Sequence, residues 1–447
     1  MVKAILSGTV VSVNERDRIS IQNQSDQVVD DVGYFELLTT NSRFRRFWFG
    51  TMIAMFGNWF NTIALFVLLL ELTESEMAIG IVLVLKMLAF SIPQIFTGML
   101  ADRYNRKNLM LLSNILSAIG AACFIFIDTI EYLWLLYVLV FLQSFLNAIF
   151  IPAERAALPN IVSDKELLTA NALDSITWSA ALAFGSALGG IITAEYGADT
   201  AFLIDSLTYL VSFFMILTIE IPQKFEPSSK ESMLKTGLKN VVDGWKYILS
   251  DKVVSRLVLP HSLWAIAGGG LVYLLVLIGD EMELEDVAMG IGFLFMARGI
   301  GVGLGPYIIK RFFKNRDKWP NMIGWLVGIG GIFYVLVGLL NWDSWIVILV
   351  VISHAASGGN WVISNVLLQQ RVPDEWRGRV FGTDMLFFAG ANAVSTLFAS
   401  VIINQGWLSL RDAVLFFGMI QMFSGIAFGI WMRYSPIDLG SQSPNHF

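Results

Sequence analysis

The chain has 447 residues, of which 55% are hydrophobic and only 15% are charged, and its formal net charge is −6. A mean hydropathy of +0.65 excludes an ordinary soluble domain and a disordered chain, because both classes carry far less apolar sequence. The single cysteine, Cys123, excludes a disulfide framework and a cysteine metal site. The composition therefore predicts an integral membrane protein.

Residues 1–33 precede the first apolar run and are rich in polar side chains. They lack the charged n-region and the following apolar stretch that mark a cleavable signal peptide. We expect a flexible N-terminal tail in the cytosol.

Apolar runs follow one another along the chain, each near the ~20 residues that a helix needs to cross the hydrocarbon core. We predict twelve transmembrane helices, with cores at residues 47–70, 78–100, 108–127, 132–152, 170–194, 200–221, 256–279, 287–309, 321–341, 345–368, 380–404 and 410–432. The expected fold class is an all-α integral membrane protein.

Charged side chains in the breaks between these runs are separated by sign. Cations gather in alternate breaks, at Arg43, Arg45, Arg46, Arg103, Arg106, Lys107, Lys310, Arg311, Lys314, Arg316, Lys318, Arg371, Arg377 and Arg379. The other breaks hold Glu71, Glu74, Glu76, Asp128, Glu131, Glu195, Asp199, Asp280, Glu281, Glu283, Glu285, Asp286 and Asp343, with Arg411 as their one cation. Because positive loops stay in the cytosol, we predict a multi-pass protein of the bacterial plasma (inner) membrane with both termini cytoplasmic.

The longest break, residues 222–255, divides the runs into six and six. It carries apolar residues at helical spacing and lysines on another face: Leu234, Leu238, Val241, Val242, Trp245, Ile248 and Leu249 against Lys235, Lys239 and Lys246. This pattern predicts an amphipathic helix on the inner leaflet, with its apolar stripe in the acyl boundary. The expected domains are an N-terminal six-helix bundle at 34–221, this linker at 222–255, a C-terminal six-helix bundle at 256–433 and a cytosolic tail at 434–447.

The two halves match each other at a fixed offset of 210 residues. The matching pairs are Glu71 and Glu281, Gly80 and Gly290, Asn105 and Asn315, Arg106 and Arg316, Asp164 and Asp374, and Asp174 and Asp384. Matches in one register indicate an internal duplication, which is how many transporters are built. The two bundles are therefore expected to be pseudo-symmetric.

The stretch GMLADRYNRK, residues 98–107, ends the second run with one carboxylate and three cations. Gly98 predicts a close helix approach, and the cations are expected to set the topology. Asp102 falls at a helix C-terminus, where a carboxylate is unfavourable, so we expect it to find a cation or a neighbouring helix N-terminus.

This stretch resembles the pattern G-x-L-A-D-R-x-x-R-K of the major facilitator superfamily, with Asn105 in place of the usual glycine. Further motifs are similar to the bacterial branch that contains enterobactin and macrolide exporters: FIPAERAALPNIV (150–162), ANAL (170–173), GSALGG (185–190), FLIDSLTYL (202–210) and RGRVFG (377–382). The resemblance implies the twelve-helix fold of that superfamily.

The resemblance also implies a charged gate at the cytosolic face. In the family, the aspartate that matches Asp102 contacts the start of helix eleven, here near Arg379–Thr383, and holds this face shut. The second copy, IIKRFFKNRD (308–317), has Phe312 in place of Asp102, so the halves are not expected to be latched equally. The gating residues implied are Gly98, Asp102, Arg103, Arg106, Lys107, Glu154, Arg155, Arg377 and Arg379.

Helices one, four, seven and ten line the central cavity by the same analogy, and polar and aromatic residues collect there. Aromatic faces with scattered amides suit a bulky amphiphile, although interhelical hydrogen bonds explain such residues equally well. Arg298 lies midway along span eight and is expected either to be ion-paired or to attract an anionic group of a substrate. The expected cavity residues are Asn58, Trp59, Asn61, Gln143, Asn147, His261, Trp264, Tyr273, His354, Asn360, Trp361 and Arg298.

Three aspartates inside the runs, Asp174, Asp205 and Asp384, are candidates for proton coupling. For Asp174 and Asp384, the structural role of a helix cap stabilised by the helix dipole is the favoured prediction. Lys86 is expected to extend toward the outer surface. Small residues that permit tight helix contact are Gly185, Gly189, Gly190, Gly299, Gly301, Gly303 and Gly305.

These features predict a secondary active transporter that exports amphiphilic small molecules, such as drugs, macrolides or siderophore-like compounds, in exchange for protons or another ion. The alternatives are a lysophospholipid or lipid translocator of the same fold, and a membrane sensor or scaffold that does not transport. An enzyme is not expected, because no nucleophile and base recur at catalytic spacing and no phosphate-binding loop is present. We expect a monomer in contact with membrane lipids, with no cofactor, no metal and no nucleic-acid partner.

Overall fold

The computed structural model describes residues 5–6, 9–10, 32–73, 75–223, 232–282, 284 and 286–436. Near the N-terminus, β1 (Ile5–Leu6) pairs antiparallel with β2 (Thr9–Val10). Most of the expected N-terminal tail, Glu74, Glu283, Glu285 and residues 437–447 of the expected C-terminal tail lie outside the described residues.

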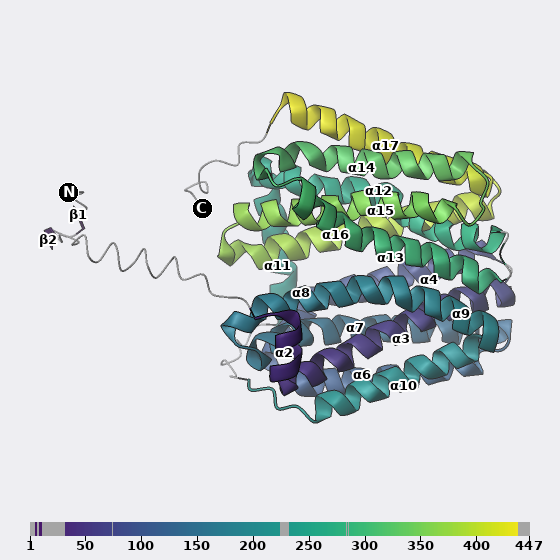
Figure 1. Ribbon diagram of the computed structural model, residues 1–447, viewed down its shortest axis with the longest axis horizontal. Helices are drawn as coiled ribbons and strands as arrows, with labels where there is room; N and C mark the ends of the chain where they lie inside the picture. The colour runs from purple at the N-terminus through teal and green to yellow at the C-terminus, as the bar shows by residue number, and fades with distance from the viewer. Residues whose placement is uncertain are drawn as a thin grey trace.

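The first half of the chain forms the lower group of helices in Figure 1. Its elements are α2 (Tyr34–Thr40), α3 (Ser42–Thr73), α4 (Glu76–Ser91), α5 (Gln94–Arg103), α6 (Arg106–Cys123), η1 (Phe124–Phe126), η2 (Ile130–Tyr132), α7 (Leu133–Ile161), α8 (Asp164–Ala180), the π-helical η3 (Ala181–Gly185), α9 (Ser186–Tyr196) and α10 (Ala198–Leu217).

The second half forms the upper group of Figure 1. Its elements are α12 (Lys252–Glu281), α13 (Val287–Phe312), η4 (Arg316–Lys318), α14 (Trp319–Leu339), α15 (Ile346–Arg371), α16 (Asp374–Asn404) and α17 (Leu410–Tyr434). A separate helix, α11 (Met233–Ser250), lies between the two groups in sequence.

The predicted all-α membrane fold is confirmed. In the described part of the chain, eleven helices are long and apolar enough to cross a membrane, and α4 with α5 forms one further, bent pair. The second span, expected to be continuous over 78–100, bends by 42° between Ser91 and Gln94. Pro93 explains this break, because proline has no N–H for the helix and its ring clashes with the preceding turn.

The internal repeat is visible in the local structure. Asn105 caps α6 by accepting a hydrogen bond from the Asn108 N–H, and Asn315 caps η4 by accepting one from the Asp317 N–H. Asp164 and Asp374 are the first residues of α8 and α16. Residues that match at the 210-residue offset thus occupy equivalent places in the two halves.

The two groups of helices contact each other at the end that carries Glu76 and Asp286, which we call the acidic end. A Cβ atom on Gly190 of α9 would lie 2.5 Å from the Ala288 carbonyl oxygen of α13, and the Tyr273 hydroxyl donates to the Glu76 carbonyl at 3.2 Å. Close approach at Gly185, Gly189, Gly190, Gly299, Gly301 and Gly305 confirms the predicted tight packing, whereas Gly303 makes only an ordinary contact.

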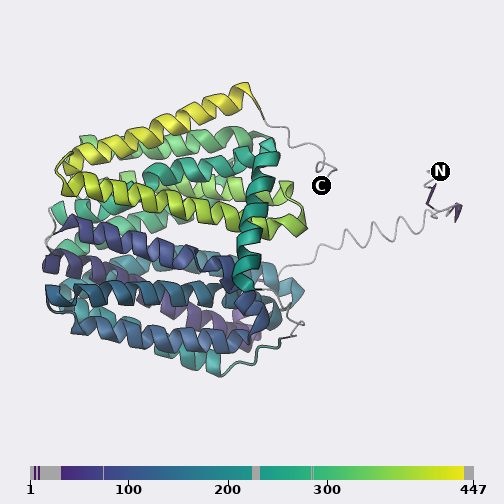
Figure 2. The ribbon, with the colours of Figure 1, turned by 180° about the vertical axis from the view of Figure 1, so that it is seen from behind.

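Helix α11 crosses the opposite end of the molecule and bridges both groups, as Figure 2 shows. A Cβ on its Gly237 would clash with the Ile95 carbonyl of α5, and one on Gly244 would clash with Arg379 and Thr383 of α16. The predicted helix therefore exists, and it packs on the two bundles by Gly237 and Gly244. Its residues Leu234, Leu238, Val242, Trp245 and Leu249 are exposed, whereas Gly237, Gly244, Tyr247 and Ile248 are buried.

Candidate functional site

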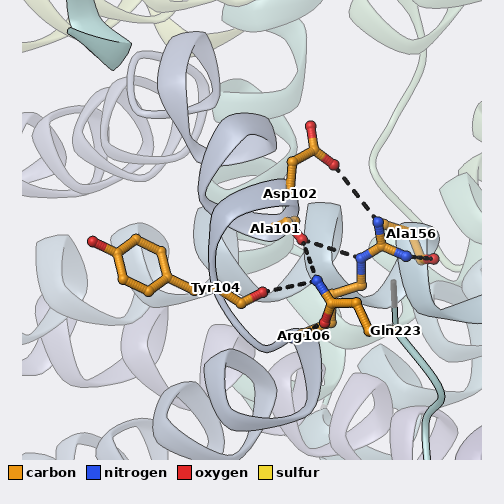
Figure 3. A network of polar contacts seen from close by, with 6 residues as sticks. All are labelled: Ala101, Asp102, Tyr104, Arg106, Ala156 and Gln223. Atoms are coloured by element: carbon orange, nitrogen blue, oxygen red, sulfur yellow. Dashed lines mark hydrogen bonds and ion pairs between the residues drawn. The ribbon is translucent and has the colours of Figure 1, made fainter. Parts of the chain in front are cut away.

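The segment 98–107, which runs from the end of α5 into the start of α6, is held together by the side chain of Arg106 (Figure 3). Arg106 Nε donates to the Ala101 carbonyl at 3.1 Å, and its Nη1 donates to the Ala156 carbonyl of α7 at 2.7 Å. The backbone N–H of Arg106 donates to Gln223 Oε1 at 2.9 Å, and Gln223 Nε2 donates to the Ala101 and Tyr104 carbonyls. Arg106 thus joins α5, α6 and α7 to the segment that enters the linker.

Asp102 does not make the contact with α16 that the family resemblance implies. Its carboxylate pairs with Arg106 at 3.6 Å, and its side chain is 72% exposed. At Arg379 and Thr383, α16 packs on α11 instead, and Thr383 Oγ1 donates to the Val241 carbonyl at 3.2 Å. In this conformation the two bundles are bridged by α11 at this end, and Asp102 has found a cation, Arg106, within its own bundle.

The other expected gating residues are anchored locally. A Cβ on Gly98 would meet no atom within 4 Å, so the predicted close approach at this glycine is wrong. Lys107 Nζ donates to the Leu217 carbonyl at the C-terminus of α10, and Arg103 is the last residue of α5. On α16, Arg377 pairs with Asp374 at 2.8 Å, and Arg379 lies 4.8 Å from the ring centre of Trp376.

A polar cavity of about 150 Å³ lies inside the first bundle, between α3, α6, α7, α8 and α10. Three expected cavity residues, Asn58, Trp59 and Asn147, line it together with Trp178 and Tyr209. Asn58 Nδ2 donates to the Tyr209 hydroxyl at 3.2 Å, which fixes the amide at the wall. The cavity offers indole rings, amides and a phenol within one space.

A second cavity, of about 160 Å³, adjoins the first, and Thr51 and Glu154 line both. Its wall brings Glu154 and Arg155 of α7 together with Asp174 of α8. From the sequence we expected Glu154 and Arg155 at the gate and Asp174 in proton coupling. Glu154 is buried, so a carboxylate stands between the two cavities.

Asp205 lies fully buried in the first bundle, with Asn61 and Gln143 beside its carboxylate. These two amides, expected in the central cavity, therefore belong to a buried polar cluster. Lys86 belongs to the same cluster, because its Nζ donates to Thr62 Oγ1 at 2.8 Å and its charge acts on Asp205. The expectation that Lys86 extends to the outer surface is wrong.

The second bundle contains a buried hydrogen bond between His261, which was expected to line the central cavity, and Asp384, which was expected to be a candidate for proton coupling. His261 Nδ1 of α12 lies 2.7 Å from Asp384 Oδ2 of α16, and both side chains are 0% exposed. The His261 ring packs on Trp361, with ring centres 4.7 Å apart, and Trp264 Nε1 donates to Ser357 Oγ at 2.7 Å. These contacts tie α12, α15 and α16 together.

Neither Asp174 nor Asp384 caps a helix. Each lies ten residues beyond the first residue of its helix, and Ser163 and Pro373 occupy the N-cap positions of α8 and α16.

Three of the remaining expected cavity residues do not line the cavity of the first bundle. Tyr273 is fully buried in the bundle contact at the acidic end, and His354 and Asn360 are buried within the second bundle.

Sequence reasoning missed several residues of these clusters. Thr62, Ser357 and Gln223 are hydrogen-bonding partners, and Tyr334 and Gln421 are buried polar residues of α14 and α17. The available signal was a polar side chain inside an apolar run, which is costly in a membrane unless it is paired. Serine, threonine and tyrosine are common enough in such runs that this signal did not single them out.

In the described part of the chain, eleven membrane-spanning helices and one bent pair form two repeated bundles, with cavities and buried charges inside. This arrangement is typical of membrane proteins of the solute transporter class. The chain belongs to the Major Facilitator Superfamily, whose family model matches residues 47–396. It is therefore a transporter of this superfamily.

Two bacterial relatives show the level of similarity. The chain is 23% identical over 400 residues to YfiS, an MFS-type transporter of Bacillus subtilis, which covers 84% of this chain and 89% of the relative. It is 24% identical over 354 residues to the enterobactin exporter EntS of Shigella boydii, which covers 77% of this chain and 82% of the relative.

Solved structures share the fold. A POT family transporter in complex with 5-aminolevulinic acid gives a TM-score of 0.70 at 14% identity, covering 92% of this chain and 100% of that one. A bacterial homologue of the human lysosomal transporter Spinster, inward-facing and unoccupied, gives 0.67 at 15% identity, covering 88% of this chain and 96% of that one. At these identities the likeness concerns the fold alone.

Proposed function

We propose that this transporter exports amphiphilic small molecules in exchange for protons. The bundles at residues 34–221 and 256–433 would rock against each other, with contact alternating between the acidic end and the end crossed by α11. Direct packing at Gly190 and Tyr273 joins the bundles at the acidic end, and in our proposal the pathway opens toward α11 in this conformation. By the distribution of cations, we assign the α11 end to the cytosol.

The observation that carries the proposal is the cavity inside the first bundle. It is lined by Asn58, Trp59, Asn147, Trp178 and Tyr209, so aromatic faces alternate with hydrogen-bonding groups. A ring with a few polar groups finds partners for both parts there, and at about 150 Å³ the cavity holds one part of an amphiphile in this conformation. The similarity to an enterobactin exporter supports the outward direction of transport.

Proton exchange is supported by the carboxylates that lie within the bundles. Glu154 and Asp174 line one cavity, Asp205 lies near Lys86, and Asp384 is bonded to His261. Ionisable groups at such depth are costly unless they are paired or used, and each of these carboxylates lies beside a cavity or a polar partner of its own bundle. Glu154 is our first candidate, because it stands between the cavity we assign to the substrate and the one that contains Asp174.

Transport by purified protein in liposomes tests the proposal. A panel of cationic, neutral and anionic fluorescent amphiphiles would be added under an imposed proton gradient, with protein-free liposomes as the blank. We expect gradient-driven accumulation of at least one amphiphile, abolished by a protonophore and slowed at least tenfold by Glu154→Gln. Asp374→Asn, a change at an exposed carboxylate at the start of α16, is the matched control and should transport normally.

Two results would overturn the proposal. Accumulation of no amphiphile, combined with robust movement of a fluorescent lysophospholipid between leaflets, would make the protein a lipid translocator. Movement of neither class of molecule would favour a sensor or scaffold. Accumulation that ignores the proton gradient would refute the coupling alone.

A further inference from the structure

Arg298 is a cation in the middle of α13 whose charge no carboxylate neutralises. Its Nε atom is buried and has no hydrogen-bonding partner, and its Cζ lies 5.7 Å from the ring centre of Phe295. Among the described residues, no carboxylate oxygen lies within 4.0 Å of this guanidinium. Arginine keeps its charge at physiological pH, so the charge itself requires a partner.

In the described part of the chain, the helices that pack on α13 place no carboxylate within ion-pair distance of Arg298. The carboxylates of α12, Asp280 and Glu281, and the one of α9, Glu195, lie in the last turns of their helices, away from the middle of α13. Helices α13, α14 and α15 carry no aspartate or glutamate at all. The one carboxylate of α17, Asp412, lies in its first turn and bonds to Ser409. On the neighbouring α16, the buried carboxylate of Asp384 is already taken by His261. Among the described residues of this bundle, Arg298 therefore has no carboxylate as an ion-pair partner.

Three further buried side chains of the same bundle carry polar atoms without a hydrogen-bonding partner. Tyr334 of α14, His354 of α15 and Gln421 of α17 are each at most 2% exposed. The Tyr334 hydroxyl, His354 Nε2 and both terminal atoms of Gln421 have no hydrogen-bonding partner. We call Arg298, Tyr334, His354 and Gln421 the arginine cluster.

The members of the arginine cluster are neighbours in space. The ring centres of Tyr334 and His354 are 5.8 Å apart, and the charge of Arg298 acts on both residues. A Cβ built on Gly330, one turn before Tyr334, would lie 2.8 Å from Gln421 Nε2, so this amide reaches α14. Four helices thus direct polar groups into one region of the bundle.

The chemistry of the cluster selects a ligand of negative charge. Guanidinium, phenol, imidazole and amide groups all supply N–H or O–H donors. A buried donor that makes no hydrogen bond costs about 1–3 kcal/mol. Water would satisfy the donors but would leave the arginine charge in a medium of low dielectric, where an unpaired ion is strongly unfavourable. An anion satisfies both requirements at once.

We propose that the arginine cluster is an anion-binding site, occupied either by the carboxylate of an amphiphilic substrate or by a free chloride ion. The first source rests on the proposed export function and makes the substrates anionic amphiphiles. The second is independent of transport and makes chloride a ligand of the second bundle. Both sources use the same donors.

Binding to the full-length protein in detergent tests the site without requiring transport. Chloride would be titrated into protein held in gluconate while the melting temperature is followed. Separately, the affinities of pyrenebutyrate and of the neutral pyrenebutanol would be compared by fluorescence. The variants are Arg298→Gln, Arg298→Lys and Arg311→Gln, the last removing an exposed arginine from the final turn of the same helix.

A substrate carboxylate predicts that wild type binds pyrenebutyrate at least tenfold more tightly than pyrenebutanol, and that Arg298→Gln removes this preference while Arg311→Gln keeps it. A free ion predicts that chloride raises the melting temperature of wild type and Arg311→Gln but not of Arg298→Gln. Arg298→Lys should retain part of either effect, because it keeps the charge but not the fork of donors.

The proposal is overturned if wild-type protein shows neither a chloride-dependent melting temperature nor a preference for the carboxylate. This result needs no variant, so a folding defect in Arg298→Gln cannot obscure it. The failure of the export function is a different observation. Protein that binds the anion in detergent but accumulates no amphiphile in liposomes would refute export and leave the site intact.

Discussion

The hydrogen bond between His261 and Asp384 should be one of the largest single contributions to the stability of the second bundle. The perturbations are His261→Ala, Asp384→Ala and the double variant. His261 Nδ1 and Asp384 Oδ2 are 2.7 Å apart, and neither side chain has any exposed surface. Each single truncation therefore leaves the other group buried without this partner.

The magnitude follows from this geometry. A hydrogen bond to a charged group contributes about 1.5–3 kcal/mol, and removing one partner of a buried pair costs about 3–5 kcal/mol because the other group stays unpaired. Asp384 Oδ1 and His261 Nε2 have no other partner to compensate. We therefore expect a coupling energy of about 2 kcal/mol between the two sites, and a smaller loss for Asp384→Asn, which keeps an acceptor.

Equilibrium unfolding in mixed detergent micelles, with increasing dodecyl sulfate, would give the free energies for a double-mutant cycle. The matched control is the Asp374 and Arg377 pair on the same helix, which has a similar distance of 2.8 Å but a 92% exposed carboxylate. This pair should show no measurable coupling, because exposed ion pairs are screened. A coupling between His261 and Asp384 no larger than that of the control would refute the argument from burial.

Two further predictions concern the packing and the loop. Gly190→Leu should hold the two bundles apart at the acidic end, because its Cβ alone would lie 2.5 Å from the Ala288 carbonyl oxygen. The assay is maleimide labelling of a cysteine placed at Val67 in a Cys123→Ser background. Labelling should become several-fold faster, and an unchanged rate would contradict the packing. Arg106→Gln should lower the free energy of unfolding by about 1–3 kcal/mol, because the Ala156 carbonyl loses a charged donor. The control is Asp102→Asn, a change at an exposed carboxylate. Equal stability of both variants would contradict the structural role of Arg106.

The sequence predicted the spans well because the membrane imposes a simple requirement. A helix must be long and apolar to cross the membrane. Runs of this kind are easy to recognise in this sequence, because the few charged residues gather in the breaks between them. The 210-residue repeat was also predictable, since Asn105 and Asn315 perform the same capping function. The bend of the second span was missed, although Pro93 is visible in the sequence.

The candidate site was less predictable because its members are brought together by tertiary packing. His261 and Asp384 are 123 residues apart, and nothing in either local sequence specifies the other. Lys86 seemed close enough to a helix end to reach water, but Thr62 of the neighbouring helix provides a nearer partner. Depth along a helix can be estimated from sequence, whereas the direction in which a side chain points depends on the neighbours.

The linker helix α11 has a mechanical consequence for the transport cycle. Gly237 rests on α5 and Gly244 on α16, and these residues are two helical turns apart, so a rigid rod separates the two bundles at this end by a length of about 10 Å. Bringing α5 and α16 together would shorten the distance between the two contact points, but the length of α11 between Gly237 and Gly244 is fixed. At least one of the two glycine contacts, Gly237 on α5 or Gly244 on α16, must therefore shift or break in every transport cycle. The linker helix thus acts as a rigid spacer that has to leave one bundle before this end can close.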